Sequence, residues 1–198
     1  QVMEPICEAK FHERNNGFRP CRSAEHAIAQ VYKFVQRSGL RFVVDIDIKG
    51  FFDNVQHGKL LKQLWQMGIR DKTLLSILSA MLKAEVAEIG FPERGTPQGG
   101  IISPLLANVV LNELDWWISS QWETIPTHHQ YAVTIAPNGT ASRGKTYRAL
   151  QSTQLKECWI VRYADDFKIL CRKRSDAVKL FAATQQWLKA RLGLDISP

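Results

Sequence analysis

The chain has 198 residues, of which 45% are hydrophobic and 23% are charged, a composition typical of a globular protein with a buried core. The 26 lysines and arginines outnumber the 19 aspartates and glutamates, and the formal net charge of +7 favours a polyanionic partner such as nucleic acid. No apolar run approaches the roughly 18 residues that a membrane span needs, so we expect no membrane partner.

The cysteines indicate the cellular compartment of the protein, and the two chain ends indicate whether the sequence is part of a longer protein. Cys7, Cys21, Cys158 and Cys171 form no CxxC pair, so a zinc site is not expected and reduced thiols in a cytoplasmic protein are the simplest interpretation. No signal peptide is visible. The chain does not begin with methionine, and residues 192–198 resemble the start of a new strand, so we expect a piece of a longer protein.

The first part of the chain predicts a helix, a strand and two further helices. Ser23 is a good N-cap for a helix that should end at about Arg37, before Gly39. Residues 41–48 (RFVVDIDI) are rich in β-branched side chains and predict a strand with at least one buried face. The next expected elements are two short helices within residues 58–82, a strand at 84–89 and a turn-rich loop at 91–100.

The second part predicts a long helix, two hairpins and a final helix. These elements are a helix from Pro104 to about Gln121, a hairpin turning at Asn138-Gly139, a hairpin around Asp165 and a helix capped by Ser175. The long helix should bury Leu106, Val109, Val110 and Leu114, and the last helix carries Val178, Phe181, Ala182, Leu188 and Leu192. Residues 123–155 are the least readable part. The order favours an α+β domain in which helices cover one face of an antiparallel sheet.

Two acidic clusters carry the most informative chemistry. Asp45 and Asp47 share one face of the expected strand at 41–48, because side chains alternate along a strand. Asp165 and Asp166 stand side by side at a tight turn, where like charges are costly unless a cation lies beside them. If the hairpin lies beside the strand, Asp47, Asp165 and Asp166 form one patch that could hold two Mg²⁺ ions roughly 4 Å apart, as in phosphoryl transfer. The alternative is solvated strand residues and an ordinary turn.

A third motif, GTPQGGIISP at residues 95–104, combines two adjacent glycines with Gln98 at the entry to the long helix. Adjacent glycines let a backbone approach a ligand closely, and a helix N-terminus suits a phosphate or a nucleotide. The alternative is a simple turn before a helix. Farther along lie Trp116, Trp117 and Trp122 and the basic residues Arg143, Lys145 and Arg148. These side chains could stack on or grip RNA, with packing of Trp116 or Trp117 in the core as the alternative.

In this order, the three motifs resemble the palm of a reverse transcriptase, and more narrowly the group II intron-encoded reverse transcriptases, also called maturases. The resemblance rests on FRP and RS within residues 18–23, DIKGFFDN at 47–54, TPQGGIISPLLANVVLNELD at 96–115 and RYADDF at 162–167. It implies a right-hand polymerase palm over residues 41–198, with fingers-type helices within 57–95, and part of the fingers over residues 1–40. The thumb and the basic fingertip are expected to be absent.

The resemblance implies a role for each residue that matches a motif. Asp47 matches the carboxylate that binds both metal ions, with the Ile48 carbonyl as a further ligand, and Asp165 and Asp166 match the second carboxylate pair. Phe52 matches the position that blocks a ribose 2′-hydroxyl and so favours deoxynucleotides; an ordinary core aromatic is the alternative. The backbone of Lys49, Gly50 and Phe51 matches the segment that lies under the triphosphate, and Gln98 and Gly99 match the motif that contacts the nucleotide and the template. Arg19 and Arg22 match a fingers motif in which Cys21 replaces the usual glycine.

The implied activity is RNA-directed DNA synthesis with two Mg²⁺ ions, in which the 3′-hydroxyl of a DNA primer attacks a dNTP on an intron RNA template. Residues 1–198 alone are expected to be weak or inactive, because the fingertip, the thumb and a lysine beyond Pro198 would lie outside them. Exposed apolar surface could then cause self-association. One alternative is an intron RNA-binding splicing cofactor whose chemistry is done by the RNA, and another is a two-metal nuclease.

Overall fold

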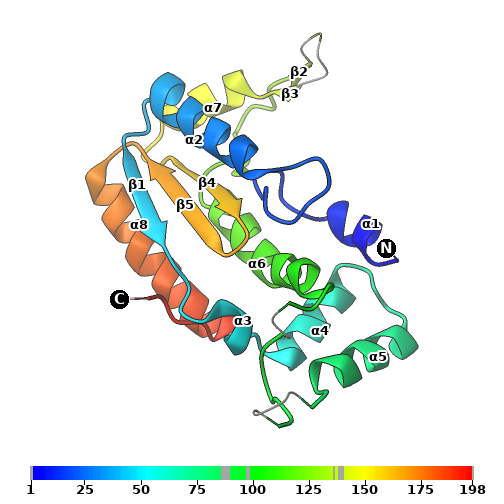
Figure 1. Ribbon diagram of the computed structural model, residues 1–198. Helices are drawn as coiled ribbons and strands as arrows, with labels where there is room; N and C mark the ends of the chain where they lie inside the picture. The colour runs from blue at the N-terminus through cyan, green and yellow to red at the C-terminus, as the bar shows by residue number, and fades with distance from the viewer. Residues whose placement is uncertain (1, 86–89, 97–98, 136, 138–140, 198) are drawn as a thin grey trace.

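The computed structural model describes residues 2–85, 90–96, 99–135, 137 and 141–197. In chain order its elements are α1 (Glu4–Glu8), α2 (Ala24–Ser38), β1 (Phe42–Ile46), α3 (Phe51–Asn54), α4 (His57–Gln66), α5 (Lys72–Leu82), α6 (Ser103–Ser120), β2 (Thr134–Ile135), β3 (Ala141–Ser142), α7 (Gly144–Gln151), β4 (Cys158–Tyr163), β5 (Asp166–Cys171), α8 (Arg174–Trp187) and the π-helical turn η1 (Leu188–Leu192). Figure 1 shows a three-stranded sheet with helices packed around it, α7 near one end and α4 and α5 near the other. The antiparallel sheet among helices confirms the α+β class.

The central sheet has the strand order β1-β5-β4, and both pairings are antiparallel. Helices α6 and α8 cover one face, whereas α2 packs on the other face against β4 and β5. Alternation along β4 explains both contacts. Arg162 bonds to α6, whereas Trp159, on the opposite face of the strand, stacks on Phe34 of α2 with ring centroids 5.0 Å apart. The helices therefore cover both faces, not the one face expected from the order of elements.

The expected helix ends in the first part of the chain are confirmed. Ser23 is the N-cap of α2, where it shares a capping box with His26, and Gly39 ends the helix with a φ of +67°. Asp71 caps α5 by accepting hydrogen bonds from two backbone N–H groups of the first turn. Helices α4 and α5 are the two short helices expected after the strand. The long helix α6 buries its four expected side chains: Leu106, Val109, Val110 and Leu114.

The last helix differs from the prediction in its start, and it buries only some of the apolar residues that it carries. Lys173 is the N-cap of α8, so Ser175 lies inside the helix. Of the expected apolar residues, Leu188 and Leu192 are buried, but three are exposed: Val178, Phe181 and Ala182. The buried stripe consists of Ala177, Leu180 and Thr184, which recur every three or four residues and so share one helical face.

One expected strand and one expected turn fall largely outside the described residues, and the strand expected at the C-terminal end is present only as a bridge. The strand at 84–89 and the turn at Asn138-Gly139 lie mostly beyond what the structure describes, although β2 and β3 pair as an antiparallel ribbon around that turn. At the C-terminal end, Ile196 forms an antiparallel bridge with Ile48. The tail therefore pairs beside the end of β1, a partner that the strand-like sequence did not identify.

The N-terminal segment packs directly against the turn between β4 and β5. Asn15 forms a parallel bridge with Arg162, whose N–H donates to the Arg14 carbonyl at 3.0 Å. Gly17 lies so close to the turn that an added Cβ would stand 2.0 Å from the backbone nitrogen of Ala164. No other residue fits at position 17 without a shift of one of the two backbones.

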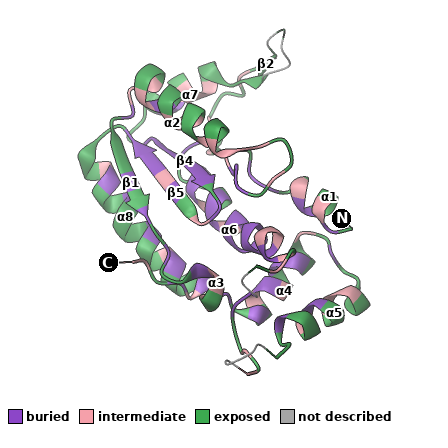
Figure 2. Ribbon diagram, viewed as in Figure 1, coloured by how far each residue is buried: buried purple, intermediate pink, exposed green. Residues whose placement is uncertain are grey.

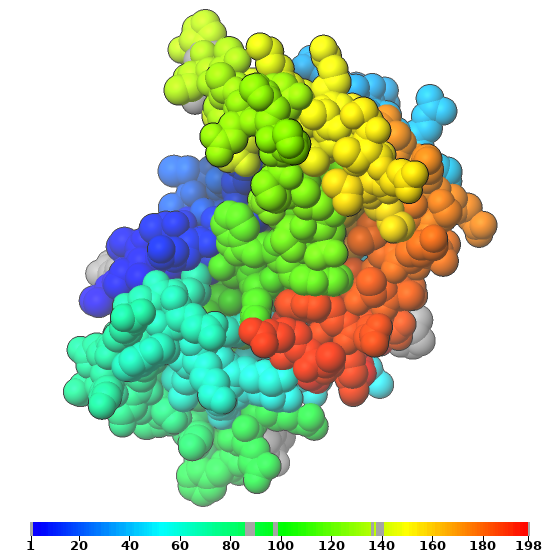
Figure 3. Space-filling view, turned by 180° about the vertical axis from the view of Figure 1, so that it is seen from behind, coloured from blue at the N-terminus to red at the C-terminus, as the bar shows by residue number. Residues whose placement is uncertain are grey.

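Burial is concentrated in β4, β5 and α6 (Figure 2), whereas α2 and α8 expose their outer faces. The view from behind (Figure 3) shows residues of α6 between α4 and α5 on one side and the C-terminal helix on the other. None of the helices in the described part of the chain combines the length and apolarity needed to cross a membrane. Cys7, Cys158 and Cys171 are buried free thiols, and burial raises the pKa of Cys171 to about 12, so this thiol stays protonated at neutral pH.

We expect Ile118→Ala to lower the free energy of unfolding by about 2–5 kcal/mol, because it leaves a cavity between α6 and the sheet. Ile118 is fully buried, whereas Ile28 on α2 is 67% exposed and provides the matched control. Ile28→Ala should change the stability by less than about 0.5 kcal/mol. Chemical denaturation measures both values, and equal losses would show that the core is not centred on α6.

Gly17→Ala should destabilise the fold by about 1–3 kcal/mol or more, because the new methyl group overlaps the backbone of the β4–β5 turn. Gly58→Ala is the control, since an added Cβ at Gly58 in α4 meets nothing within 4 Å. That substitution should leave the stability unchanged or raise it by up to about 1 kcal/mol. Thermal unfolding compares the two, and a Gly17→Ala protein as stable as Gly58→Ala would refute the close packing of residue 17 on the turn.

Candidate active site

The pairing of β1 with β5 brings the predicted aspartates to one end of the sheet. Asp45 lies opposite Lys168 in the register of the two strands. Asp47 follows the end of β1, and Asp165 and Asp166 lie at the turn that leads into β5. The adjacency of strand and hairpin on which the predicted patch depends is therefore present.

Asp45, Asp47 and Asp166 have partners within the protein. Lys168 lies between two of them, with its Nζ 2.5 Å from Asp45 Oδ1 and 2.6 Å from Asp166 Oδ1. Ser197 donates its hydroxyl to Asp47 Oδ2 at 2.8 Å and its N–H to the Asp47 carbonyl at 2.9 Å. Burial lowers the pKa of Lys168, but its hydrogen bonds to the two carboxylates outweigh this effect and raise it. Lys168 therefore stays an ammonium at neutral pH and links β1 to β5.

The donor atoms suit a hard divalent cation, but the side chains do not form a finished metal site. Mg²⁺ prefers carboxylate oxygens, and the side chains of Asp45 and Asp166 are 69% and 67% exposed, so a cation can reach them. Within the described ranges, no three His, Cys, Asp or Glu side chains are grouped closely enough to hold a metal ion. To bind a metal ion here, Asp166 would have to release Lys168, and Asp47 would have to release Ser197.

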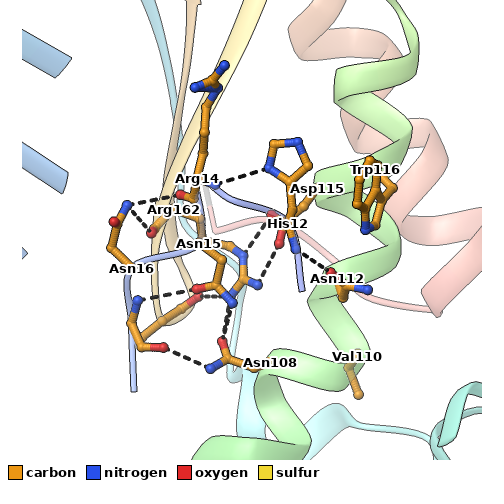
Figure 4. Close-up of polar contacts among 12 residues, drawn as sticks. His12, Arg14, Asn15, Asn16, Asn108, Val110, Asn112, Asp115, Trp116 and Arg162 are labelled. Carbon is orange, nitrogen blue, oxygen red and sulfur yellow. Dashed lines mark hydrogen bonds and ion pairs between the residues drawn. The ribbon is translucent and has the colours of Figure 1, made fainter. Parts of the chain in front are cut away.

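A buried arginine anchors the turn that carries Asp165 (Figure 4). Arg162 and Asp115 on α6 are 0% and 1% exposed and form a bidentate pair, with Nε to Oδ1 at 2.8 Å and Nη2 to Oδ2 at 2.7 Å. The third nitrogen, Nη1, donates to the carbonyl of Ala164 at 2.6 Å and to Asn108 Oδ1 at 3.0 Å. Ala164 has a φ of +57°, a left-handed conformation that costs energy in a residue other than glycine, so the surrounding contacts must hold it.

Two asparagines connect this pair to the N-terminal segment. Asn108 accepts from Asn15 Nδ2 at 3.0 Å, and its own Nδ2 donates to the Gly17 carbonyl at 2.8 Å. Asn15 Oδ1 in turn accepts from the Gly17 N–H at 3.2 Å. Segments more than 90 residues apart thus meet at the turn through buried polar groups that satisfy one another.

Sequence reasoning did not single out this network, although a signal was available. Arg162 stands in the otherwise apolar strand CWIVRY, and an arginine in a buried strand requires an acidic partner. Asn108 and Asp115 both lie in the long matched motif at 96–115, seven residues apart on α6. That spacing places them on one helical face, which predicts a shared contact.

The residues expected to bind the nucleotide lie between the end of β1 and the loop that enters α6. Gly50 has a φ of +51° and forms the N-cap of α3, which starts with buried Phe51 and half-buried Phe52. The Phe52 carbonyl accepts from the Thr96 N–H at 2.7 Å, so the loop is held against α3. The Lys49 N–H donates to the Asp195 carbonyl. Of the remaining predicted residues, Ile48 is buried, Gly99 is exposed and Gln98 lies outside the described residues.

The two arginines of the expected fingers motif are bound within the protein. Arg19 pairs with Glu8, and its side chain is 7% exposed. Arg22 donates to the carbonyl of Glu13. Cys21, where the family usually has a glycine, has a φ of +57°, so it keeps the left-handed conformation that glycine favours.

The basic residues farther along the chain are exposed. Arg143, Lys145 and Arg148 lie at or within α7, and each is open to solvent. Of the tryptophans considered for RNA stacking, Trp122 is fully buried and Trp116 is 46% exposed. Trp117 is half-buried and packs against the core, as the core alternative for Trp116 or Trp117 expected.

Comparisons with known proteins agree with this architecture. The family described as reverse transcriptase (RNA-dependent DNA polymerase) matches residues 1–198. The chain is 32% identical to protein YkfC of Escherichia coli over 212 residues, covering 98% of the chain and 53% of YkfC. It is 39% identical to the group II intron-encoded protein LtrA of Lactococcus lactis over 120 residues, covering 59% of the chain and 20% of LtrA. The chain thus spans about half or less of these relatives.

Solved structures show the same fold at low sequence identity. Telomerase from Candida albicans, in complex with a fragment of telomeric RNA, superposes with a TM-score of 0.61 at 10% identity, covering all of this chain and 32% of the telomerase chain. Apo telomerase from Candida tropicalis gives a TM-score of 0.60 at 9% identity, with coverages of 100% and 35%. The chain therefore belongs to the reverse transcriptase family, and the resemblance to group II intron-encoded reverse transcriptases is confirmed by a relative of that kind.

Proposed function

We propose that the full-length protein is a group II intron reverse transcriptase that synthesises DNA on an intron RNA template from a DNA primer and dNTPs. The observation that carries the proposal is the pairing of β1 with β5, which gathers Asp47, Asp165 and Asp166 at one end of the sheet in a chain of this family. We assign residues 41–198 to the palm, with fingers-type helices within 57–95, and residues 1–40 to the fingers. The thumb and the fingertip belong to regions outside this chain.

In this proposal, Asp47, Asp165 and Asp166, together with the Ile48 carbonyl, hold two Mg²⁺ ions. When bound, the ions activate the primer hydroxyl and neutralise the leaving pyrophosphate. The chain itself carries Asp47 just past the end of β1 and Asp165 and Asp166 at the turn into β5, and Lys168 supplies a counter-charge to Asp166 and to Asp45. Reverse transcriptases of this family use divalent metal ions, which supports the assignment.

We further assign the nucleotide to the surface formed by α3 and the loop that enters α6. The backbone of Lys49, Gly50 and Phe51 lies under the triphosphate in this proposal, and Gln98 and Gly99 contact the nucleotide and the template. Phe52 excludes a ribose 2′-hydroxyl. Its half-buried ring beside Phe51, with ring centroids 5.3 Å apart, is supported from behind and so can act as a steric barrier.

Exposed basic residues on α7 favour a second function, binding of the intron RNA as a splicing cofactor. Arg143, Lys145 and Arg148 add positive charge at one end of the molecule. Arg19 and Arg22 would join these contacts only by exchanging Glu8 and the Glu13 carbonyl for phosphate. Both functions are compatible with one cytoplasmic protein.

A groove of about 850 Å³ between α1, α5 and the start of α6 is mostly apolar, and we propose that residues 1–198 alone self-associate through it, which sedimentation velocity would detect.

Asp165→Asn should lower primer extension on an RNA template by roughly 100-fold or more, because an amide is a poorer metal ligand than a carboxylate. Asp176→Asn, in the first turn of α8, is the control and should leave the rate unchanged. Both assays use the full-length protein, and melting temperatures within about 3 °C of the parent would show that the fold is intact. Extension at the parental rate by Asp165→Asn would contradict the polymerase assignment.

Phe52→Val should raise the incorporation of ribonucleotides relative to deoxynucleotides by roughly tenfold or more, because a smaller side chain no longer blocks the 2′-hydroxyl. Phe181→Ala, at a position on α8 that is 38% exposed, should leave the ratio unchanged. Single-nucleotide extension with matched dNTP and rNTP concentrations measures the ratio. If Phe52→Val keeps the parental preference, Phe52 is a packing residue and not the barrier.

The double substitution Lys145→Gln with Arg148→Gln should weaken binding of the intron RNA and make the dependence of log K on log salt shallower by about 1–2. Arg174→Gln with Lys179→Gln removes the same charge from exposed positions on α8 and should have a smaller effect. RNA binding should survive Asp47→Ala, since the carboxylate is not needed for phosphate contacts. Identical salt slopes for the two double variants would remove α7 from the RNA interface.

A further inference from the structure

Four hydrogen bonds place the guanidinium of Arg162 directly behind the residue that precedes Asp165. Two go to Asp115 on α6, one goes to Asn108 and the fourth goes to the carbonyl of Ala164 at 2.6 Å. The guanidinium is planar and rigid, so its two contacts with the Asp115 carboxylate determine where the remaining nitrogen points. The Ala164 carbonyl is thereby held at a defined position relative to α6.

Holding that carbonyl also orients the next residue. The carbonyl of Ala164 and the N–H of Asp165 belong to one planar peptide unit, so a fixed carbonyl leaves the Asp165 Cα with little freedom. On the other side of the turn, Gly17 packs its backbone against the nitrogen of Ala164. The left-handed φ of Ala164 is thus enforced from two directions, and such a conformation persists only where its surroundings over-determine it.

Stability alone does not explain why an ion pair occupies this place. A buried pair can often be replaced by apolar side chains of similar volume without loss of stability. Apolar side chains could not, however, donate to the Ala164 carbonyl. The feature specific to Arg162 and Asp115 is therefore control of the backbone at the turn.

We propose that Arg162 and Asp115, assisted by Asn108, are positioning residues that hold Asp165 in the orientation required for binding the catalytic cation. The inference rests on the proposed function, because it assumes that Asp165 is a metal ligand. Arg162 in the RYADDF motif and Asp115 at the end of the 96–115 motif thus gain a role in the reaction. They exert it through the backbone of the turn and not through contact with substrate.

Asp115→Asn in the full-length protein tests the proposal, with Glu123→Gln as the matched control. Glu123 is also a buried carboxylate paired with an arginine, Arg14, but its other partners are Ser119 and Tyr147 and not the turn. The readouts are the affinity for Mn²⁺ without substrates, measured by electron paramagnetic resonance, and the Mg²⁺ concentration for half-maximal primer extension. We expect Asp115→Asn to weaken Mn²⁺ binding by about 10–100-fold and to raise the Mg²⁺ requirement in parallel. Glu123→Gln should change both by less than about twofold, even if it lowers the melting temperature equally.

A second variant separates positioning from folding, because Asp115→Asn leaves Arg162 buried without its charge partner. The double substitution Arg162→Met with Asp115→Leu removes both charges, so no unpaired buried charge remains and its melting temperature should lie above that of Asp115→Asn. We still expect weak Mn²⁺ binding, since the Ala164 carbonyl has lost its donor. A double variant that folds and binds Mn²⁺ with parental affinity would overturn the proposal. Failure of the proposed function would look different: the unsubstituted protein would show no primer extension, or Asp165→Asn would bind Mn²⁺ as tightly as the parent.

Discussion

The buried pair of Arg162 and Asp115 is the interaction on which the geometry of the site depends. Both side chains are withdrawn from water, so each charge needs the other and the neighbouring polar groups to offset its lost hydration. The bonds that satisfy them also join β4, α6 and the N-terminal segment at a single point, the turn before Asp165. Asp165 lies one residue away from this rigid base. Exposed ligands such as Asp166 are thus carried by a turn whose backbone is held by buried hydrogen bonds.

Much of the site could be predicted from local patterns. Period-two alternation correctly placed Asp45 on the exposed face of β1, opposite buried Val44 and Ile46, and Asp47 is exposed just past the end of the strand. Two carboxylates between apolar runs identified the hairpin at Asp165, and the cap residues Ser23 and Gly39 identified the ends of α2. These features depend on residues close in sequence, which is why a single chain reveals them.

The remainder depends on contacts between distant segments. Lys168 meets Asp45 across 123 residues, and a strand pattern alone does not say which charges will face one another. The position of α2 on the second face of the sheet follows from the stacking of Trp159 on Phe34, a tertiary contact. Which apolar residues of α8 are buried also depends on such contacts: Val178 is exposed and Leu180 is buried, and hydrophobicity alone does not reveal which stripe a sheet will cover.

The central claim is that the carboxylates at the end of β1 and at the β4–β5 turn form one cation site. Anomalous diffraction from crystals of the protein soaked in Mn²⁺ tests this most directly, because manganese is located independently of any activity. The account predicts anomalous peaks bounded by Asp47 and Asp165, with Ser197 or Lys168 displaced from its carboxylate. Peaks at other positions only, with Lys168 still bridging Asp45 and Asp166, would contradict it.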